Sequence, residues 1–334
     1  MNMKKRIMSM ALVGIMILSG CKKGGEEKPE NDVVQDLGGD IVLKVGESEM
    51  TDNQFQFFLD EIKNQMQGTE LSTEESWENA EIDGKKAIEV AKERAYDIAV
   101  DYLSGIELGK KLGMECTQEE IDSSKSQINT SYFDKYTDGD SIIDLMCEAE
   151  IYLGKIQQKF LEENALTEEE KEKYFNEHKD EFASQYLRAK HVLILTQNEE
   201  TKESLPEAEK AEKKKKADEI LARAKNGEDF DALVKEFSED PGSQSQPDGY
   251  VFTSGEMVPE FENCVRGLGM DEIGFTETSY GYHIIKRLDL DLVSCKSLIE
   301  SSIYSEKFVK YMEEKIDEYK IEAVKNDEEY NAIK

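Results

Sequence analysis

Two of the three histidines in this chain of 334 residues lie in apolar runs that are typical of β-strands. His191 is followed by Val-Leu-Ile, and His283 is followed by Ile-Ile. Three further side chains that could serve the same site lie on the segments between these runs: Asp240, Met257 and Phe261. This set combines a few fixed polar groups with an apolar surface. No Gly-rich phosphate loop, His-Glu-x-x-His or Cys-x-x-Cys motif occurs, so we expect no cofactor and no metal site.

The segment that carries these residues, from about Tyr186 to Leu288, resembles a parvulin-type peptidyl-prolyl isomerase. The matching stretches are Phe237-Ser-Glu-Asp-Pro-Gly-Ser, Gly255-Glu-Met-Val-Pro-Glu-Phe and Thr278-Ser-Tyr-Gly-Tyr-His-Ile-Ile. The resemblance implies four catalytic residues: His191, Asp240, Thr278 and His283. It also implies four substrate-binding residues around the proline ring: Tyr250, Phe252, Met257 and Phe261.

Prolyl isomerisation breaks no covalent bond, and its barrier of about 20 kcal/mol is the loss of amide resonance. Such an enzyme needs an apolar cup for the proline ring and fixed polar groups near the imide. Asp240 lies where parvulins carry Cys or Asp, and an apolar setting predicts a raised pKa for its carboxyl group. Each residue also has a structural interpretation. Asp240 could cap a turn before proline, Met257 and Phe261 could be core residues, and a histidine on a strand could be a buried structural residue.

One stretch departs from the family pattern. Many parvulins read Gly-Gly-Asp-Leu-Gly before the aromatic residue, whereas this chain reads Gln246-Pro-Asp-Gly-Tyr-Val-Phe. The missing leucine leaves one apolar wall open, which Tyr250 or Val251 could replace. Parvulins directed to phosphate carry a basic cluster after the first strand. This chain has Thr196-Gln-Asn-Glu-Glu there, so we do not expect phosphate-dependent recognition.

The elements that must position these residues follow the order β-α-α-α-β-β, which fits the small antiparallel sheet of parvulins. A strand is predicted at 187–195, and a helix follows that Ser204 caps and Pro206 opens. Apolar residues at helical spacing predict a second helix at 230–237, and Pro259 begins a third. Residues 274–278 and 282–287 read as a closing hairpin.

Helical patterns lie on both sides of this segment. Capping patterns at Thr51, Thr117 and Thr167 and apolar periodicity at 84–112, 142–161 and 296–319 predict helices. The order resembles SurA-like and PrsA-type chaperones, in which the isomerase is inserted into one helical domain. We therefore predict an α+β chain with an N-terminal helical segment at 41–184, the parvulin domain at 185–289, and a C-terminal segment at 290–334 that packs with the first. Alternatively, the C-terminal helix only caps the isomerase domain.

The first twenty residues read as a secretory signal, with basic residues at 4–6 and an apolar run at 7–18. Leu18-Ser-Gly-Cys21 resembles a bacterial lipobox, which would make Cys21 the acylated N-terminus, with a flexible tether over 21–40. An ordinary signal peptide is the alternative. Removal of residues 1–20 would change the formal net charge from −32 to −35, because three basic residues and no acids are lost. That charge disfavours nucleic acid and anionic membrane surfaces as partners.

The sequence therefore predicts a lipid-anchored foldase on the extracytoplasmic face of a bacterial membrane. It would isomerise Xaa-Pro bonds in unfolded exported proteins, alone or as a homodimer. The alternative is a holdase that uses the parvulin domain only to bind peptides. The spacing of the other cysteines matches no metal or disulfide signature, and their redox state stays open: Cys116, Cys147, Cys264 and Cys295.

Overall fold

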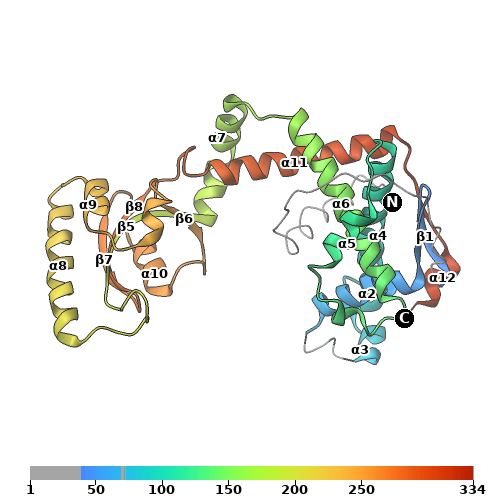
Figure 1. Cartoon of the computed structure of the whole chain (residues 1–334), viewed down its shortest axis with the longest axis horizontal. Coiled ribbons are helices and arrows are strands. Elements are labelled where there is room, and N and C mark those ends of the chain that lie inside the picture. Colours follow the sequence, from blue (N-terminus) through green and yellow to red (C-terminus); the bar gives the residue numbers. More distant parts are fainter. Residues whose placement is uncertain (1–38, 69–70, 72, 334) are drawn as a thin grey trace. The chain divides into compact units, whose positions relative to one another are not determined.

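The computed structural model describes residues 39–68, 71 and 73–333, which divide into two compact units (Figure 1). One unit, the helical unit, combines the described residues up to Ala165 with those from Tyr304 onward. The other, the sheet unit, runs from Leu166 to Ile303. The predicted α+β class, a small antiparallel sheet within a mainly helical chain, is confirmed. Cys21 and the predicted leader lie outside the described residues.

The helical unit begins with one short hairpin, β1–β2, and a second, β3–β4, lies between its helices α3 and α4. Its elements before Ala165 are β1 (Ile41–Val45), β2 (Ser48–Thr51), α2 (Asp52–Met66), α3 (Glu74–Asn79), β3 (Glu81–Ile82), β4 (Lys85–Lys86), α4 (Ala87–Lys111), α5 (Gln118–Lys125), η3 (Thr130–Phe133) and α6 (Gly139–Glu163). Capping boxes begin α2 at Thr51 and α5 at Thr117, as the sequence predicts. The buried face of α2 carries Phe55, Phe58, Leu59 and Ile62.

The C-terminal end of the chain completes the helical unit. Its elements are the second half of α11 (Lys296–Glu318), β9 (Ala323–Lys325) and α12 (Asp327–Ala332). Strand β9 pairs antiparallel with β1. Met312 and Ile316 lie in the same apolar core as residues of α2, α4 and α6. The C-terminal segment thus supplies a strand and core side chains to the N-terminal part of the chain.

The sheet unit is built on four antiparallel strands in the order β6-β5-β8-β7. Its elements are α7 (Glu168–Gln185), β5 (Tyr186–Leu195), α8 (Glu207–Lys225), α9 (Phe230–Phe237), η4 (Pro241–Gln244), β6 (Tyr250–Thr253), α10 (Pro259–Gly267), β7 (Ile273–Glu277), β8 (Gly281–Leu288) and the first turns of α11. Because side chains alternate along a strand, the two faces of the sheet carry different residues.

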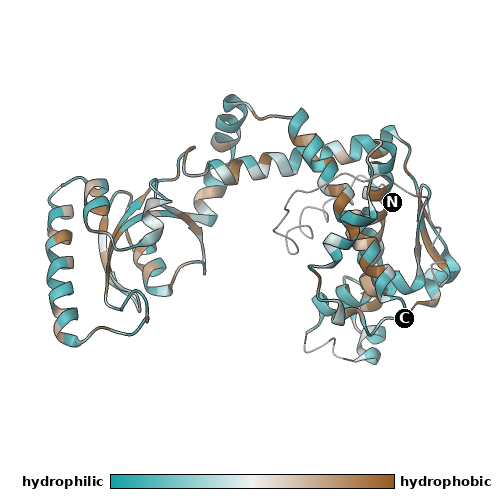
Figure 2. Cartoon of the chain, in the orientation of Figure 1, coloured by the Kyte–Doolittle hydropathy of each residue, from teal (hydrophilic) through white to brown (hydrophobic). Residues whose placement is uncertain are grey.

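One face packs against α8 and α9 through an apolar cluster that includes Val192, Ile194, Leu233 and Ile284. The other face packs against α10 through Phe252, Phe261, Val265 and Ile285 among others. Helix α8 is hydrophilic over most of its length in Figure 2, and only a narrow stripe of it, which includes Ala217 and Ile220, is buried. We call the two sides of the sheet the α8 face and the α10 face.

Three details differ from the sequence expectation. The sheet unit begins at Leu166 rather than at 185 and extends to Ile303, because α7 and the start of α11 share an apolar cluster built on Phe182 and Ile299. Helix α8 has Pro206 at its N-cap, and Ser204 instead forms a β-bridge with Gln197. Strand β6 was not predicted. Among the described residues, no helix has the length and apolar character to cross a membrane.

Candidate active site

The register of β5 and β8 brings the two predicted histidines together on the α10 face. His191 lies opposite Ile285, and Leu193 lies opposite His283. Paired residues in an antiparallel sheet point to the same side, so both imidazoles emerge beside each other. Their ring centroids are 5.2 Å apart, edge to face. Both are buried, with 9% and 5% of their surface exposed.

Aromatic side chains enclose the histidine pair. Phe261, from the first turn of α10, lies 5.2 Å from the His191 ring and 5.5 Å from the His283 ring. Phe252 on β6 lies behind it, with ring centroids 6.0 Å apart. Half-buried Met257 packs against the same cluster. Met257 and Phe261 are therefore part of the apolar core, and Phe261 is also a neighbour of both histidine rings.

Tyr250 supplies the wall that the altered loop left open. Its ring stacks on His191 at 5.5 Å with an interplanar angle of 14°. Val251, the other residue considered for this place, packs instead in the cluster that includes Phe182. The alternation of β6 explains the difference, because Tyr250 and Val251 point to opposite sides of the sheet.

Asp240 is held near the histidines because the segment before it docks on the edge of β5. The amide of Glu239 donates to the carbonyl of Leu193 at 2.8 Å, and the Leu193 amide donates to the Ser238 hydroxyl at 3.2 Å. The Glu239 carboxylate also accepts from the amide of Leu195 at 2.8 Å. The chain that leaves α9 is thus fixed along two residues of the strand before it reaches Asp240.

The Asp240 carboxylate accepts three hydrogen bonds. They come from the Tyr250 hydroxyl at 2.6 Å, the Ser243 hydroxyl at 3.0 Å and the Gly242 amide at 3.1 Å. Its Oδ2 also lies 3.4 Å from Nε2 of His191. The bond to Gly242 is the turn cap expected of an Asp before Pro, and Asp240 is the N-cap of η4. One carboxylate therefore caps the turn and faces the site.

The expectation of a raised pKa at Asp240 is wrong. Burial alone would raise it, but His191, the Tyr250 hydroxyl and the Gly242 amide outweigh burial and hold the pKa of Asp240 well below its usual value. Burial and the bond to Asp240 raise the pKa of Tyr250 above its usual value. At neutral pH Asp240 is thus an ionised carboxylate and Tyr250 a protonated phenol. The Asp240 carboxylate therefore acts as a hydrogen-bond acceptor and not as a donor.

His283 is held by Thr278, as the sequence predicts. The Thr278 hydroxyl and Nε2 of His283 are 2.9 Å apart, and the Tyr280 amide donates to the same hydroxyl at 3.1 Å. Burial, followed by the proximity of His191, lowers the pKa of His283 to about 3. His283 is therefore a neutral imidazole at physiological pH. All eight predicted site residues of the sheet unit lie together in this cluster.

Two features of the site were not predicted. Ser243 bonds the Asp240 carboxylate, and its signal in the sequence was a hydroxyl three residues after Asp240, directly behind Asp-Pro-Gly. Gly242 lies so close to Tyr250 that a Cβ there would be 2.1 Å from the phenolic oxygen. Only glycine at position 242 lets that hydroxyl reach Asp240. Spacing in one chain segment could not show this contact, because Tyr250 comes from another element.

The arrangement uses its hydroxyl groups as hydrogen-bond partners, that of Thr278 for His283 and that of Tyr250 for Asp240. It offers an apolar surface from Met257 and Phe261, with a fixed anion and a phenolic donor at its edge. Such a site can bind a small apolar ring and act on the charge distribution of a neighbouring polar group.

Comparison with known proteins finds one matching family and several similar proteins. Residues 172–290 match the family described as PPIC-type PPIASE domain. The foldase protein PrsA of Caldanaerobacter subterraneus subsp. tengcongensis is 29% identical over 287 residues, which cover 84% of this chain and 85% of the relative. That of Geobacillus kaustophilus is 29% identical over 294 residues, or 86% of this chain and 79% of the relative. The crystal structure of PrsA from Bacillus subtilis matches 70% of this chain at 22% identity with a TM-score of 0.29.

Proposed function

This chain is a PrsA-like foldase with a parvulin-type peptidyl-prolyl isomerase domain, and on that premise we propose how its site works. Met257 and Phe261 bind the proline ring, and Asp240 faces the carbonyl group of the preceding residue. The observation that carries the proposal is the bonded pair of Asp240 and Tyr250 beside the histidine rings, with hydroxyl and carboxylate oxygens 2.6 Å apart.

The ionised state of Asp240 decides its role. A planar imide owes its stiffness to a resonance form with negative charge on oxygen and positive charge on nitrogen. A carboxylate near that oxygen disfavours the charge separation, so the twisted amide becomes easier to reach. The apolar cup acts in the same direction, because it removes the water that stabilises the polar planar form. The hydrogen bonds from Tyr250, Ser243 and Gly242 keep the anion in place during the reaction.

A proline-peptide isomerisation assay on the chain from Lys22 onward tests this role. We expect Asp240→Ala to lower kcat/KM about 100-fold, equivalent to about 2.7 kcal/mol, while peptide affinity changes little. Asp240→Asn keeps an oxygen acceptor but loses the charge, so we expect it to resemble Asp240→Ala. Asp248→Ala is the matched control, because its exposed side chain lies on the neighbouring loop and only its backbone carbonyl is used in the fold.

Two results would contradict the proposal. Full activity in Asp240→Asn would show that the charge is not needed. Wild-type protein that binds proline peptides without accelerating their isomerisation would instead support a holdase that uses this domain only for binding.

We further propose that the foldase acts outside the cytoplasm, anchored to the membrane through a lipid on Cys21, and that its clients are unfolded exported proteins. The support is the leader-like N-terminus followed by Leu18-Ser-Gly-Cys21. The strongly negative chain gives no electrostatic attraction to an anionic membrane, so a lipid must provide the attachment.

The anchor can be tested by fractionation of cells that express the full chain. We expect Cys21→Ser to move the protein from the membrane fraction to the soluble or secreted fraction. Cys116→Ser is the matched control, because it removes a cysteine of the helical unit and should leave the distribution unchanged. Membrane association of Cys21→Ser that persists at moderate salt would contradict lipid anchoring.

A further inference from the structure

We propose that Arg188 is a positioning residue of the isomerase site, and that it acts by holding the loop that delivers Tyr250 to Asp240. The inference rests on the proposed function for the part played by Tyr250. Arg188 lies on β5 at the point where the strand pairs on both sides, opposite Val251 of β6 and Leu288 of β8. Its side chain is on the α8 face, away from the histidines.

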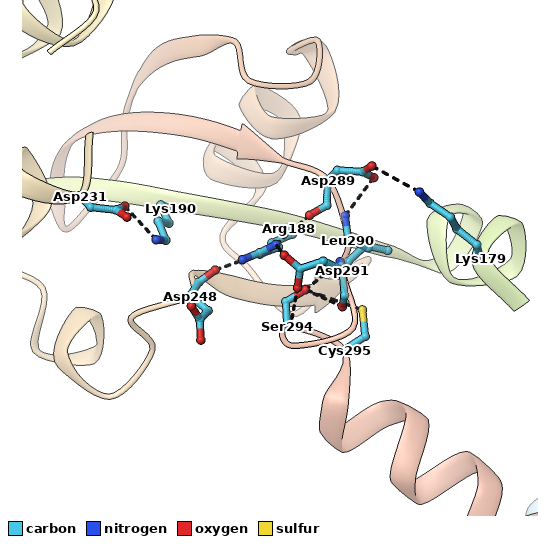
Figure 3. Close-up of polar contacts among 10 residues, drawn as sticks. All are labelled: Lys179, Arg188, Lys190, Asp231, Asp248, Asp289, Leu290, Asp291, Ser294 and Cys295. Carbon is cyan, nitrogen blue, oxygen red and sulfur yellow. Dashed lines mark hydrogen bonds and ion pairs between the residues drawn. The ribbon is translucent and has the colours of Figure 1, made fainter. Parts of the chain in front are cut away.

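The guanidinium of Arg188 joins two loops that are far apart in the sequence (Figure 3). Its Nε donates to the backbone carbonyl of Asp248 at 2.9 Å. Its Nη1 donates to the backbone carbonyl of Asp289 at 2.9 Å and forms an ion pair with the carboxylate of Asp291. Arg188 is only 8% exposed. A buried arginine needs such partners, because an unpaired charge removed from water is strongly destabilising.

The loop held by Arg188 is the departure from the family pattern that the sequence shows at 246–250. The Gly249 amide closes a turn onto the carbonyl of Gln246 at 2.9 Å. Gly249 has φ +90°, and a Cβ there would lie 2.8 Å from the carbonyl oxygen of Ala189. The turn is thus pressed against the backbone of β5 on one side and bonded to Arg188 on the other.

Tyr250 is the next residue after this turn, two positions from the carbonyl that Arg188 holds. Its hydroxyl must reach Asp240 at 2.6 Å while its ring stacks on His191. A displacement of about 1 Å is enough to break such a bond and to disturb a reacting geometry. The fixed carbonyl of Asp248 therefore determines whether the phenol and the carboxylate meet.

The counter-ion of Arg188 is fixed as well. Asp291 accepts from the Ser294 amide at 2.8 Å, and its carbonyl accepts from the Cys295 amide at 3.0 Å. These bonds form the turn that leads into α11. The next cation on the same face of β5, Lys190, is paired with Asp231 at 2.8 Å and has no bond to the loop, so it offers a matched control.

A double-mutant cycle with kcat/KM as the readout tests the inference on the chain from Lys22 onward. We expect Arg188→Gln to lower kcat/KM about fivefold in the wild-type background but less than about twofold in a Tyr250→Phe background, because residues that act through one another are not additive. Arg188→Lys keeps the ion pair with Asp291 but loses the bond from Nε, so its turnover should fall nearly as far. Lys190→Gln should match wild type in both backgrounds.

Equal losses for Arg188→Gln in the two backgrounds would overturn the inference, since they would show a general structural effect. Full turnover in both Arg188 variants would overturn it too. If Arg188→Gln does not fold, Arg188→Lys carries the same cycle, because it retains the buried charge pair. Failure of the proposed function is seen separately, as absent turnover in wild type or unchanged turnover in Asp240→Ala.

Discussion

The two faces of the four-stranded sheet are made by the same strands and differ in what their residues do. Ile284 and Ile285 are neighbours on β8, and both are fully buried. Ile284 pairs with Val192 on β5 and Phe275 on β7, and it lies in the apolar cluster under α8 and α9. Ile285 pairs with His191 and lies in the cluster under α10 that contains Phe261.

The comparison shows how the sheet accommodates buried polar groups. The α8 face is apolar where α8 and α9 cover it, and Arg188, buried on the same face, has its own hydrogen-bond partners. The α10 face carries two histidines, a threonine and, at its edge, a carboxylate: the Thr278 hydroxyl bonds Nε2 of His283, and Oδ2 of Asp240 lies 3.4 Å from Nε2 of His191. Successive residues of β5 and β8 thus alternate between the apolar cluster under α8 and α9 and the face that carries the histidines, and Arg188 is the exception on the α8 face.

The largest effect that would test this division is truncation of the two isoleucines. We expect Ile284→Ala and Ile285→Ala each to lower the stability of the sheet unit by about 2–5 kcal/mol. Only Ile285→Ala should change kcat/KM per folded molecule, because its side chain supports the His191 ring. Hydrogen exchange of β5 and β8 amides measures the stability of this unit, since the single tryptophan, Trp77, lies in the helical unit.

Conservative variants separate packing from loss of fold. Ile284→Val and Ile285→Val should each cost about 0.5–1.5 kcal/mol and leave both proteins folded. If Ile284→Val changed turnover as much as Ile285→Val, the two faces would not be functionally distinct.

A second effect comes from the neutral state of His283. Its pKa is lowered to about 3 in the folded protein, against 6.5 as the ordinary value. The unfolded chain therefore binds a proton below pH 6.5 that the folded chain does not bind. Stability is present above pH 6.5 and is lost as pH falls toward 3, with a slope of at most about 1.4 kcal/mol per pH unit. We expect a loss of about 2 kcal/mol between pH 6.5 and 5, measured by urea unfolding.

Two histidine variants test this prediction, His283→Gln and, as its control, His178→Gln. His283→Gln should remove the slope between pH 6.5 and 5, whatever its effect on stability at neutral pH. His178→Gln changes a residue of α7 outside the sheet and should keep it. The pH range of the measurement, 6.5 to 5, lies above the range in which carboxylates such as Asp240 titrate. If the stability of His283→Gln kept the same dependence on pH, the buried His283 imidazole would not be the cause of that dependence.

Much of the fold follows from local sequence signals. The capping boxes at Thr51, Thr117 and Thr167 begin helices where expected. The apolar run at 187–195 and the closing hairpin also appear as strands. These signals work because caps and periodicity are properties of neighbouring residues. Strand β6 was not predicted, because it has only four residues and follows a turn. Its strand conformation depends on its pairing with β5.

The site residues were reached through family motifs, and the sequence could not give their ionisation. Asp240 was expected to have a raised pKa because its apolar neighbours were visible in the sequence. The groups that hold the pKa low come from three places in the chain: His191 on β5, Tyr250 on β6, and the Gly242 amide in the turn after Asp240. Arg188 gave no signal as a positioning residue, because its partners lie 60, 101 and 103 residues away.

The smallest effect concerns the point where the turn meets the α10 face. Gly242→Ala would place a Cβ 2.1 Å from the Tyr250 hydroxyl, so the phenol must leave Asp240. We expect kcat/KM to fall about threefold to fivefold with less than about 1 kcal/mol change in stability. Gly267→Ala is the control, since a Cβ there meets no atom within 4 Å. In a Tyr250→Phe background the nearest ring atom, Cζ, lies 3.2 Å from that Cβ, so the clash is much smaller and Gly242→Ala should cause little further loss. A clear further loss of kcat/KM in that background would show that Gly242→Ala acts through the turn and not through Tyr250.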